Sequence, residues 1–184
     1  MTGKDFEQIC LRRMEDHEAR GEATMGRYGV QSTMRHDEKL NAMVWQPVAS
    51  LPDFEGVLAP DGHQFVIECK VCSGTKVDLH DSKIADRQRK HLLKRAKFGA
   101  TSLLLIHWNE RVLRTKREPP ETWAIPVHPA LPLWEAIDRA EVKSINRQTC
   151  RDYGVLVEWN TTPGGRTPRP DVLAAVKALQ ETFA

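Results

Sequence analysis

No stretch of the 184-residue sequence is apolar for long enough to cross a membrane, and no N-terminal segment resembles a secretion signal. The seven histidines show no His-Glu-x-x-His spacing or other zinc pattern, and no internal repeat is evident. These absences argue against membrane proteins, secreted proteins, zinc peptidases and repeat proteins. We therefore expect a soluble intracellular protein.

Cysteine is scarce: the chain has four, and their spacing shows no disulfide framework. Cys69 and Cys72 form a single Cys-x-x-Cys motif, whereas a zinc site would need a second pair. Because Cys69 also falls on the predicted core side of a strand, we interpret both as ordinary reduced cysteines and assign no metal to them.

The formal net charge is only +2, with a pI of about 8.4, so the total charge does not argue for a nucleic-acid partner. A mass of 20.9 kDa suits one domain with a proper core and is too small for two. We expect residues 1–160 to form this domain and 161–170, rich in proline and glycine, to be a linker. Residues 171–184 would then be a C-terminal helix packed on the domain or on a dimer partner.

The stretch 52–70 predicts a β-hairpin. A short apolar run after Asp53 leads to turn-forming residues at 60–62, and the next eight residues alternate as a strand does. Side chains along a strand alternate between its two faces, so Glu68 and Lys70 share one face. The opposite, core-facing side carries Phe65, Ile67 and Cys69.

The three polar residues of this hairpin suit phosphodiester hydrolysis. Asp53 and Glu68 offer the oxygen ligands that Mg²⁺ prefers, and a bound Mg²⁺ polarises a phosphate and acidifies a water. Lys70 would stabilise the pentacovalent phosphate or orient the attacking water. The simpler interpretation is a surface hairpin with a glutamate and a lysine, because Glu-x-Lys often occurs by chance.

The apolar spacing elsewhere predicts helices and strands in turn. We expect helices over 2–21, 82–98, 133–142 and 171–183, with Thr2 and Asp171 as N-caps of the first and last. We expect strands over 26–34, 101–108, 122–127 and 155–159, with 101–108 as the central one because it is apolar throughout. Residues 36–50 are interpreted as an excursion before the hairpin.

The predicted helix over 82–98 has a narrow apolar stripe made by Ile84, Leu92 and Ala96. Gln88 lies on or beside this stripe, where an unpaired amide would be costly. Before the helix stand Asp78, His80 and Asp81, which we interpret as capping residues rather than metal ligands, because the helix dipole favours carboxylates there.

Basic residues gather in three parts of the chain, and as clusters they are candidates for phosphate contacts, although each alone is more often a solvated side chain. The first set, on the N-terminal helix and the stretch after it, is Arg12, Arg13, Arg27 and Arg35. The second, on the helix over 82–98, is Lys83, Arg87, Arg89, Lys90, Lys94 and Arg95. The third, in the turn after the central strand, is Arg111, Arg114, Lys116 and Arg117.

The Pro-Asp dipeptide, the spacing of 15 residues from Asp53 to Glu68 (68 − 53) and the Glu-x-Lys motif resemble the PD-(D/E)XK nuclease superfamily. Further landmarks between residues 3 and 146 resemble those of RecU-type Holliday junction resolvases in order and spacing, and are similar to those of archaeal resolvases. They are Gly3-Lys4-Asp5-Phe6-Glu7, Asp53-Phe54-Glu55-Gly56, Phe65 to Lys70, Gln88 with His91-Leu92, Gly99 to Ile106 and Lys143-Ser144-Ile145.

The resemblance implies an α/β fold: a single domain with a central mixed β-sheet flanked by helices, as in the restriction-endonuclease-like core. It implies a metal-dependent, structure-selective endonuclease that resolves four-way DNA junctions by paired symmetric nicks, with Mg²⁺ as cofactor and Mn²⁺ able to substitute. The expected location is the cytoplasm of a bacterium or of a phage-infected host. The stalk that enters the junction in RecU-type enzymes corresponds to 36–50, at most a short version here.

The resemblance also assigns roles to two further residues. It makes Gln88 a metal-site residue and Glu7 an outer ligand or a partner of metal-bound water, although Glu7 is as well explained as a solvated helix residue. RecU-type enzymes usually carry a threonine two residues before the aspartate, and Leu51 cannot coordinate a metal in its place. Metal binding would therefore rely on Asp53, Glu68, Gln88, backbone oxygen and water.

Two alternatives stay open. One is another PD-(D/E)XK endonuclease, of restriction or repair type, that acts on ordinary duplex DNA. The other is a non-catalytic DNA-binding relative, against which the intact Asp53, Glu68 and Lys70 speak.

A homodimer is expected from the substrate. A four-way junction has two-fold symmetry, and paired nicks need two active centres, whereas one chain has one. The candidate contact surfaces are 36–50, with its apolar residues beside charges, and the C-terminal helix.

Overall fold

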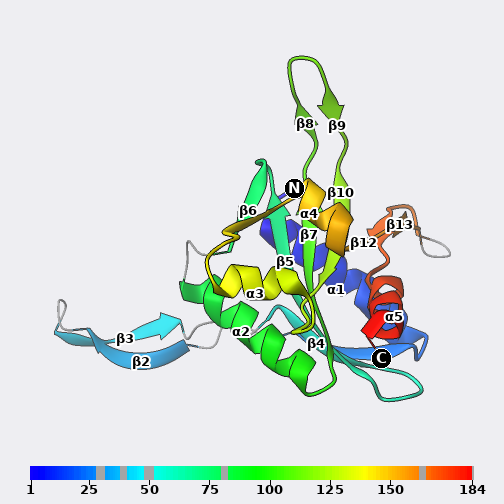
Figure 1. Cartoon of the computed structure of the whole chain (residues 1–184). Helices are drawn as coiled ribbons and strands as arrows, with labels where there is room; N and C mark the ends of the chain where they lie inside the picture. The colour runs from blue at the N-terminus through cyan, green and yellow to red at the C-terminus, as the bar shows by residue number, and fades with distance from the viewer. Residues whose placement is uncertain (28–31, 38–40, 48–51, 80–82, 162–164, 184) are drawn as a thin grey trace.

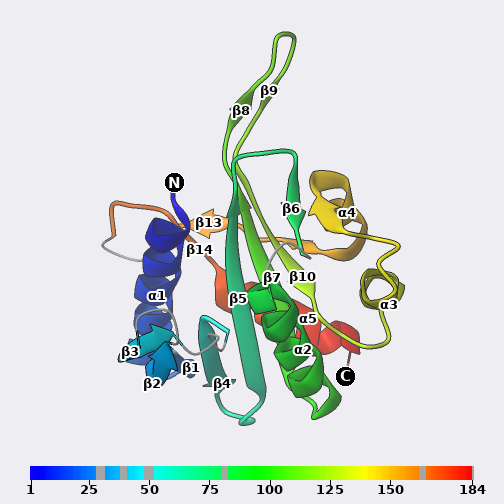
Figure 2. The same ribbon diagram turned by 90° about the vertical axis from the view of Figure 1, so that its left-hand side faces the viewer.

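The structure is a computed structural model, and it describes residues 1–27, 32–37, 41–47, 52–79, 83–161 and 165–183. Its centre is a six-stranded sheet in the order β1-β4-β5-β7-β10-β12 (Figures 1 and 2). The strands are β1 (Ala23–Arg27), β4 (Phe54–Leu58), β5 (Gln64–Cys72), β7 (Thr101–Trp108), β10 (Glu121–Pro126) and β12 (Val155–Leu156). None of the described helices is both long enough and apolar enough to pass through a membrane.

The sheet is mixed because one pair of strands is parallel. β5 and β7 run in the same direction, with Glu68 opposite Leu104, and every other neighbouring pair in the sheet is antiparallel. Helix α2 (Lys83–Lys97) supplies the crossover that a parallel pair requires. The predicted α/β architecture, one domain with a central mixed sheet flanked by helices, is confirmed.

Helices cover both faces of the sheet (Figure 2). α1 (Gly3–Ala19) and α5 (Val172–Phe183) contribute to a core on one face, which includes Phe65, Ile67 and Cys69 of β5. α2, α3 (Pro132–Asp138) and α4 (Arg147–Tyr153) contribute to a core on the other face. The alternation predicted for β5 is therefore confirmed, because Glu68 and Lys70 line a recess on the face that α2 covers.

Local sequence explains how α1 begins and what it buries. The Thr2 hydroxyl accepts a hydrogen bond from the Asp5 N–H at 3.2 Å, and the Asp5 carboxylate accepts one from the Thr2 N–H at 2.9 Å. Phe6, Cys10 and Met14 then repeat at helical spacing, and all three are buried. The predicted N-cap and apolar stripe of this helix are confirmed.

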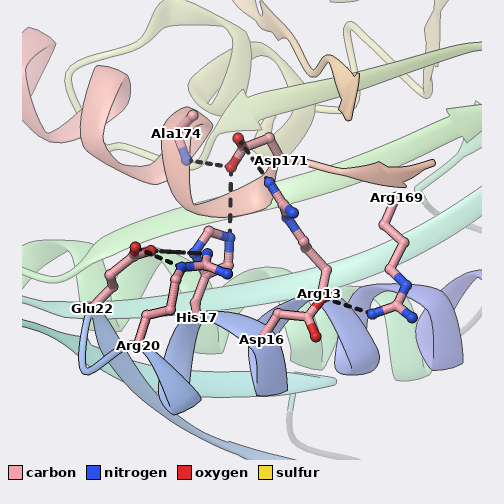
Figure 3. A network of polar contacts seen from close by, with 8 residues as sticks. All are labelled: Arg13, Asp16, His17, Arg20, Glu22, Arg169, Asp171 and Ala174. Atoms are coloured by element: carbon pink, nitrogen blue, oxygen red, sulfur yellow. Dashed lines mark hydrogen bonds and ion pairs between the residues drawn. The ribbon is translucent and has the colours of Figure 1, made fainter. Parts of the chain in front are cut away.

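A polar network joins α1 to the start of α5 (Figure 3). Arg13 donates to Asp171 at 3.1 Å, and the same carboxylate caps α5 by accepting from the Ala174 N–H at 3.3 Å. His17 lies between Glu22, at 2.6 Å, and Asp171, at 3.6 Å. The N-cap predicted at Asp171 is confirmed, and α5 packs on its own chain.

Several elements differ from the sequence prediction. The strand expected over 26–34 includes parts of two elements in different sheets, and residues 28–31 lie outside the described part of the chain. β1, which includes Gly26 and Arg27, pairs with β4, whereas β2 (Ser32–Asp37) pairs with β3 (Ala42–Pro47) in a separate hairpin that projects from the body (Figure 1). The helix expected over 133–142 ends at Asp138, and Ala140 adopts a left-handed conformation, with φ of 59°, that breaks the helix.

Short pairings between distant segments account for the elements that the sequence did not predict. They are β6 (Lys76–Asp78) with β11 (Ser144–Asn146), β8 (Arg111–Val112) with β9 (Arg117–Glu118), and β13 (Trp159–Asn160) with β14 (Arg169–Pro170). Residues 169–170, expected to belong to a loop, thus pair back on the chain. Asp78 does not cap α2, since it lies in β6 and pairs with Lys76 at 3.2 Å; His80 and Asp81 lie outside the described residues.

The buried side chain of His107 should make the free energy of unfolding depend on pH. It is buried, its Nδ1 lies 2.9 Å from the Thr122 hydroxyl, and burial lowers its pKa from 6.5 to about 4. Between these two values the unfolded chain binds a proton that the folded chain does not, so lowering the pH from about 6.5 to 4 should remove up to about 3 kcal/mol of unfolding free energy. Urea unfolding of wild type and His107→Gln across this range checks it: parallel pH curves would contradict the prediction.

Candidate active site

Two strands, β4 and β5, and two helices, α1 and α2, bring the predicted catalytic residues together. Asp53 immediately precedes β4, whose Phe54 pairs with Ile67 of β5, so Asp53 stands beside the stretch that carries Glu68. The Asp53 carboxylate accepts a hydrogen bond from the Cys69 N–H at 2.7 Å, which fixes it against β5. Lys70 lies one pleat further along the same strand.

Glu68 and Lys70 form the centre of the site. The Lys70 ammonium lies 2.6 Å from one oxygen of Glu68, and it donates a second hydrogen bond to the side-chain oxygen of Gln88 on α2 at 3.3 Å. Glu68 is only 2% exposed, whereas the Lys70 side chain is 33% exposed. The Lys70 ammonium is therefore held by two buried side chains, while part of the lysine side chain is exposed to solvent.

The second oxygen of Glu68, Oε2, is buried and has no hydrogen-bond partner among the described residues. Behind it lies a recess whose apolar lining comes from Leu79, Leu92, Leu104 and Trp134. An unpartnered carboxylate oxygen against an apolar wall is costly in the folded state unless a proton or a cation compensates it.

Burial is also the main influence on the pKa values of the carboxylates in the site. Burial raises the pKa of Glu68 to about 7 against the opposing effect of Lys70, and the charges of Asp53 and Glu7 raise it further. Burial also raises the pKa of Asp53, an effect that the Cys69 N–H opposes and Glu7 reinforces. The negative charge of Glu7 thus adds to the cost of ionising Asp53 and Glu68, and that of Asp53 adds to the cost for Glu68; a bound cation would relieve both.

Glu7 reaches the site from α1. Its carboxylate pairs with Arg27 of β1 at 2.6 Å, and its charge acts on both Asp53 and Glu68. Among the residues that the structure describes, no three His, Cys, Asp or Glu side chains are grouped tightly enough to hold a metal ion as they stand. A cation that takes one or two carboxylates and keeps several waters, as Mg²⁺ commonly does, would need no such group.

The structure corrects the prediction of phosphate contacts at two residues, which are buried and paired with acidic side chains. Arg13 is buried and paired with Asp171, and Arg89 is buried and paired with Asp86 and Asp138. Both guanidiniums have partners within the fold: Arg13 joins α1 to the start of α5, and Arg89 joins α2 to α3 and to its own first turn.

The other predicted basic residues lie at or near the surface. Arg12, Arg87, Lys94, Arg114 and Lys116 are exposed. Four more have acidic partners: Arg27 with Glu7, Lys90 with Asp86, Arg95 with Glu55, and Arg117 with Glu110. Arg111 lies 3.7 Å from Glu118. The side chains of Arg35 and Lys83, like Leu51, lie outside the described part of the chain.

The sequence does not predict the apolar wall behind Glu68, which is made by Leu79, Leu104 and Trp134. Leu104 belongs to a predicted strand, but Leu79 and Trp134 come from segments with no sequence signal that would direct them to this site. Their contribution depends on where α3 and the end of β6 pack, which is a property of the assembled fold.

A scan of protein-family models gives no match, and neither does a search of curated proteins. Among solved structures, the chain is similar to Hjc, a Holliday junction resolvase from the archaeal hyperthermophile Archaeoglobus fulgidus. The sequence identity is 15% and the TM-score 0.46, over 84% of this chain and 95% of that chain. A likeness this distant carries no information about activity.

Proposed function

We propose that this protein is a metal-dependent endodeoxyribonuclease that resolves four-way DNA junctions. The observation that carries the proposal is the unpartnered, buried oxygen of Glu68, next to Asp53 and Lys70 in the order and spacing that resemble PD-(D/E)XK nucleases. A purely structural Glu-Lys pair has no use for a second carboxylate beside it or for a carboxylate oxygen without a partner, because both destabilise the fold.

The donor set suits Mg²⁺, with Mn²⁺ as a substitute. Asp53 and Glu68 would hold the ion through carboxylate oxygens, with Gln88 and Glu7 at its margin. When bound, Mg²⁺ supplies Lewis-acid polarisation of a phosphate and a water of lowered pKa.

The chain's own groups do the rest. Lys70, oriented by Glu68 and Gln88, donates hydrogen bonds to a phosphate oxygen and stabilises the negative charge that builds up on it. The Cys69 N–H fixes the Asp53 carboxylate, so that the site is rigid before substrate arrives. The apolar wall made by Leu79, Leu104 and Trp134 excludes water from the rear of Glu68.

Phosphate contacts are proposed for the exposed basic residues. Those of α2, Arg87 and Lys94, and those of the β8–β9 hairpin, Arg114 and Lys116, are free of the burial that removes Arg13 and Arg89 from this role. Such contacts bind DNA without regard to sequence and weaken steeply with salt.

The test compares cleavage of a labelled four-way junction with cleavage of a linear duplex of the same sequence, in Mg²⁺ and in EDTA. We expect paired nicks near the branch point, no cutting of the duplex at the same enzyme concentration, and no cutting in EDTA. Equal cutting of both substrates would replace the proposal with a duplex nuclease of restriction or repair type. Tight binding without cutting in Mg²⁺ would leave a non-catalytic DNA-binding protein.

We further propose a homodimer, because one chain carries one set of Asp53, Glu68 and Lys70, and paired nicks need two. The apolar face of α5 is used within its own chain, which leaves the β2–β3 hairpin as the candidate contact. Met34 and Met43 are exposed and lie on one face of this hairpin, since Met34 and His36 are two residues apart and Met43 pairs with His36.

Light scattering at micromolar concentration should therefore give twice the chain mass for wild type and a smaller mass for Met34→Ser/Met43→Ser. Mixed dimers with one Asp53→Asn subunit should nick one strand and leave its partner intact. A chain that stays monomeric on a bound junction would rule out paired nicking by a dimer.

A further inference from the structure

The β8–β9 hairpin projects from one end of the central sheet (Figures 1 and 2). β5 runs towards the same end, and Lys70 lies near the last residue of this strand, Cys72. In the parallel ladder Lys70 lies opposite Ile106, and β8 begins five residues later, at Arg111 (111 − 106). At about 3.3 Å per strand residue, the base of the hairpin is on the order of 15 Å beyond Lys70. DNA held at Lys70 would therefore lie within reach of the hairpin.

The tip of this hairpin carries two exposed apolar side chains, Val112 at the end of β8 and Leu113 at the start of the turn. Val112 is 79% exposed and the adjacent Leu113 is 40% exposed. The Leu113 N–H donates to the Lys116 carbonyl at 2.8 Å, which closes the turn. The two side chains are thus presented on an ordered tip, so that little conformational entropy is lost when they are buried.

The charges around the tip are separated by sign. The two nearby carboxylates, Glu110 and Glu118, are paired with Arg117 and Arg111 at the stem. Arg114 and Lys116 are exposed at the tip itself. The tip therefore presents two aliphatic side chains and two cations, with the acidic groups behind it neutralised.

DNA offers the matching chemistry better than a protein surface does, because phosphates accept the cations while nucleobases accept aliphatic side chains inserted between them. Inserting a side chain costs unstacking energy, and this cost is least where stacking is already interrupted. The branch point of a junction is such a place.

We propose that Val112 and Leu113 form a wedge that packs between nucleobases at the branch point of the bound junction, while Arg114 and Lys116 contact the flanking phosphates. The inference rests on the proposed function, and it assigns recognition of the branch to a part of the chain separate from the catalytic residues.

The test uses Val112→Ser/Leu113→Ser, with Phe98→Ser as the matched control because Phe98 is an 80% exposed apolar residue at the far end of α2. The probe is a four-way junction with 2-aminopurine at the branch point or in mid-arm, bound in EDTA so that no strand is cut. Wild type and Phe98→Ser should raise the fluorescence at the branch but not in mid-arm. The wedge variant should lose most of that rise and bind the junction about tenfold more weakly, with duplex affinity and salt dependence unchanged.

Three outcomes would contradict the wedge, its DNA partner or the proposed function separately. If the wedge variant gives the wild-type fluorescence and affinity, the wedge is wrong while junction cleavage stands. If it changes the mass in light scattering but not the fluorescence, the tip contacts protein instead of DNA. If wild type binds the junction no more tightly than the duplex and cuts both equally, the proposed function itself fails.

Discussion

Replacing Lys70 with alanine, Glu68 with glutamine or Asp53 with asparagine should each slow junction cleavage on the order of 10²- to 10³-fold or more. Lys70→Ala removes the cation that Glu68 and Gln88 orient. Glu68→Gln and Asp53→Asn keep the shape of the side chain, but each removes a negative charge to which a metal ion would bind. Single-turnover cleavage of a labelled junction in Mg²⁺ measures the loss.

Junction binding in EDTA should stay within a few-fold of wild type for all three variants, because the proposed phosphate contacts lie on α2 and on the β8–β9 hairpin. Lys76→Ala is the matched control, since Lys76 is an exposed lysine that also pairs with a carboxylate, Asp78, but lies outside the site. It should cut at the wild-type rate. A Lys70→Ala protein that cuts equally fast would show that the site has been assigned to the wrong residues.

Replacing Gly56 with alanine should destabilise the fold by about 3 kcal/mol or more. A methyl group on Gly56 would lie 2.3 Å from the Thr24 carbonyl oxygen and 2.4 Å from Cζ of Phe65. The first atom belongs to the backbone of β1 and the second to a fully buried ring, so neither can move aside cheaply. Urea unfolding followed by circular dichroism measures the loss.

Gly26→Ala provides the control in the neighbouring strand. A methyl group there would have the Glu55 carbonyl oxygen at 3.9 Å as its nearest neighbour, an ordinary contact. We expect its unfolding free energy to stay within about 0.5 kcal/mol of wild type. Equal stability of the two variants would mean that Phe65 does not pack over Gly56.

Local patterns explain the part of the site that sequence predicts well. The two-residue alternation of β5 places Glu68 and Lys70 on one face, and helical spacing from Leu92 places Gln88 on the buried side of α2. Both inferences need only the geometry of one strand or one helix, which neighbouring residues determine. Asp53 follows from them, because a hairpin brings its two strands side by side.

Remote partners explain the part that sequence does not predict. Arg13 sits next to Met14 on the buried side of α1, but its role depends on Asp171, 158 residues away. Arg89 depends in the same way on Asp138. A single sequence does not show such pairings, so each arginine looked like one more member of a basic cluster. The strand pair β6–β11 was missed for the same reason.

The attachment of α1 to α5 also bears on the order in which a newly made chain becomes active. α1 supplies Glu7 and leaves the ribosome before α5, yet part of the core that covers α1 comes from α5, and contacts between segments so far apart form late. We therefore expect the proposed active site to be incomplete during synthesis until Val172–Phe183 has emerged. Chains stalled before Val172 should then fail to cleave a junction, so that the proposed activity would appear only once α5 has folded onto the rest of the chain.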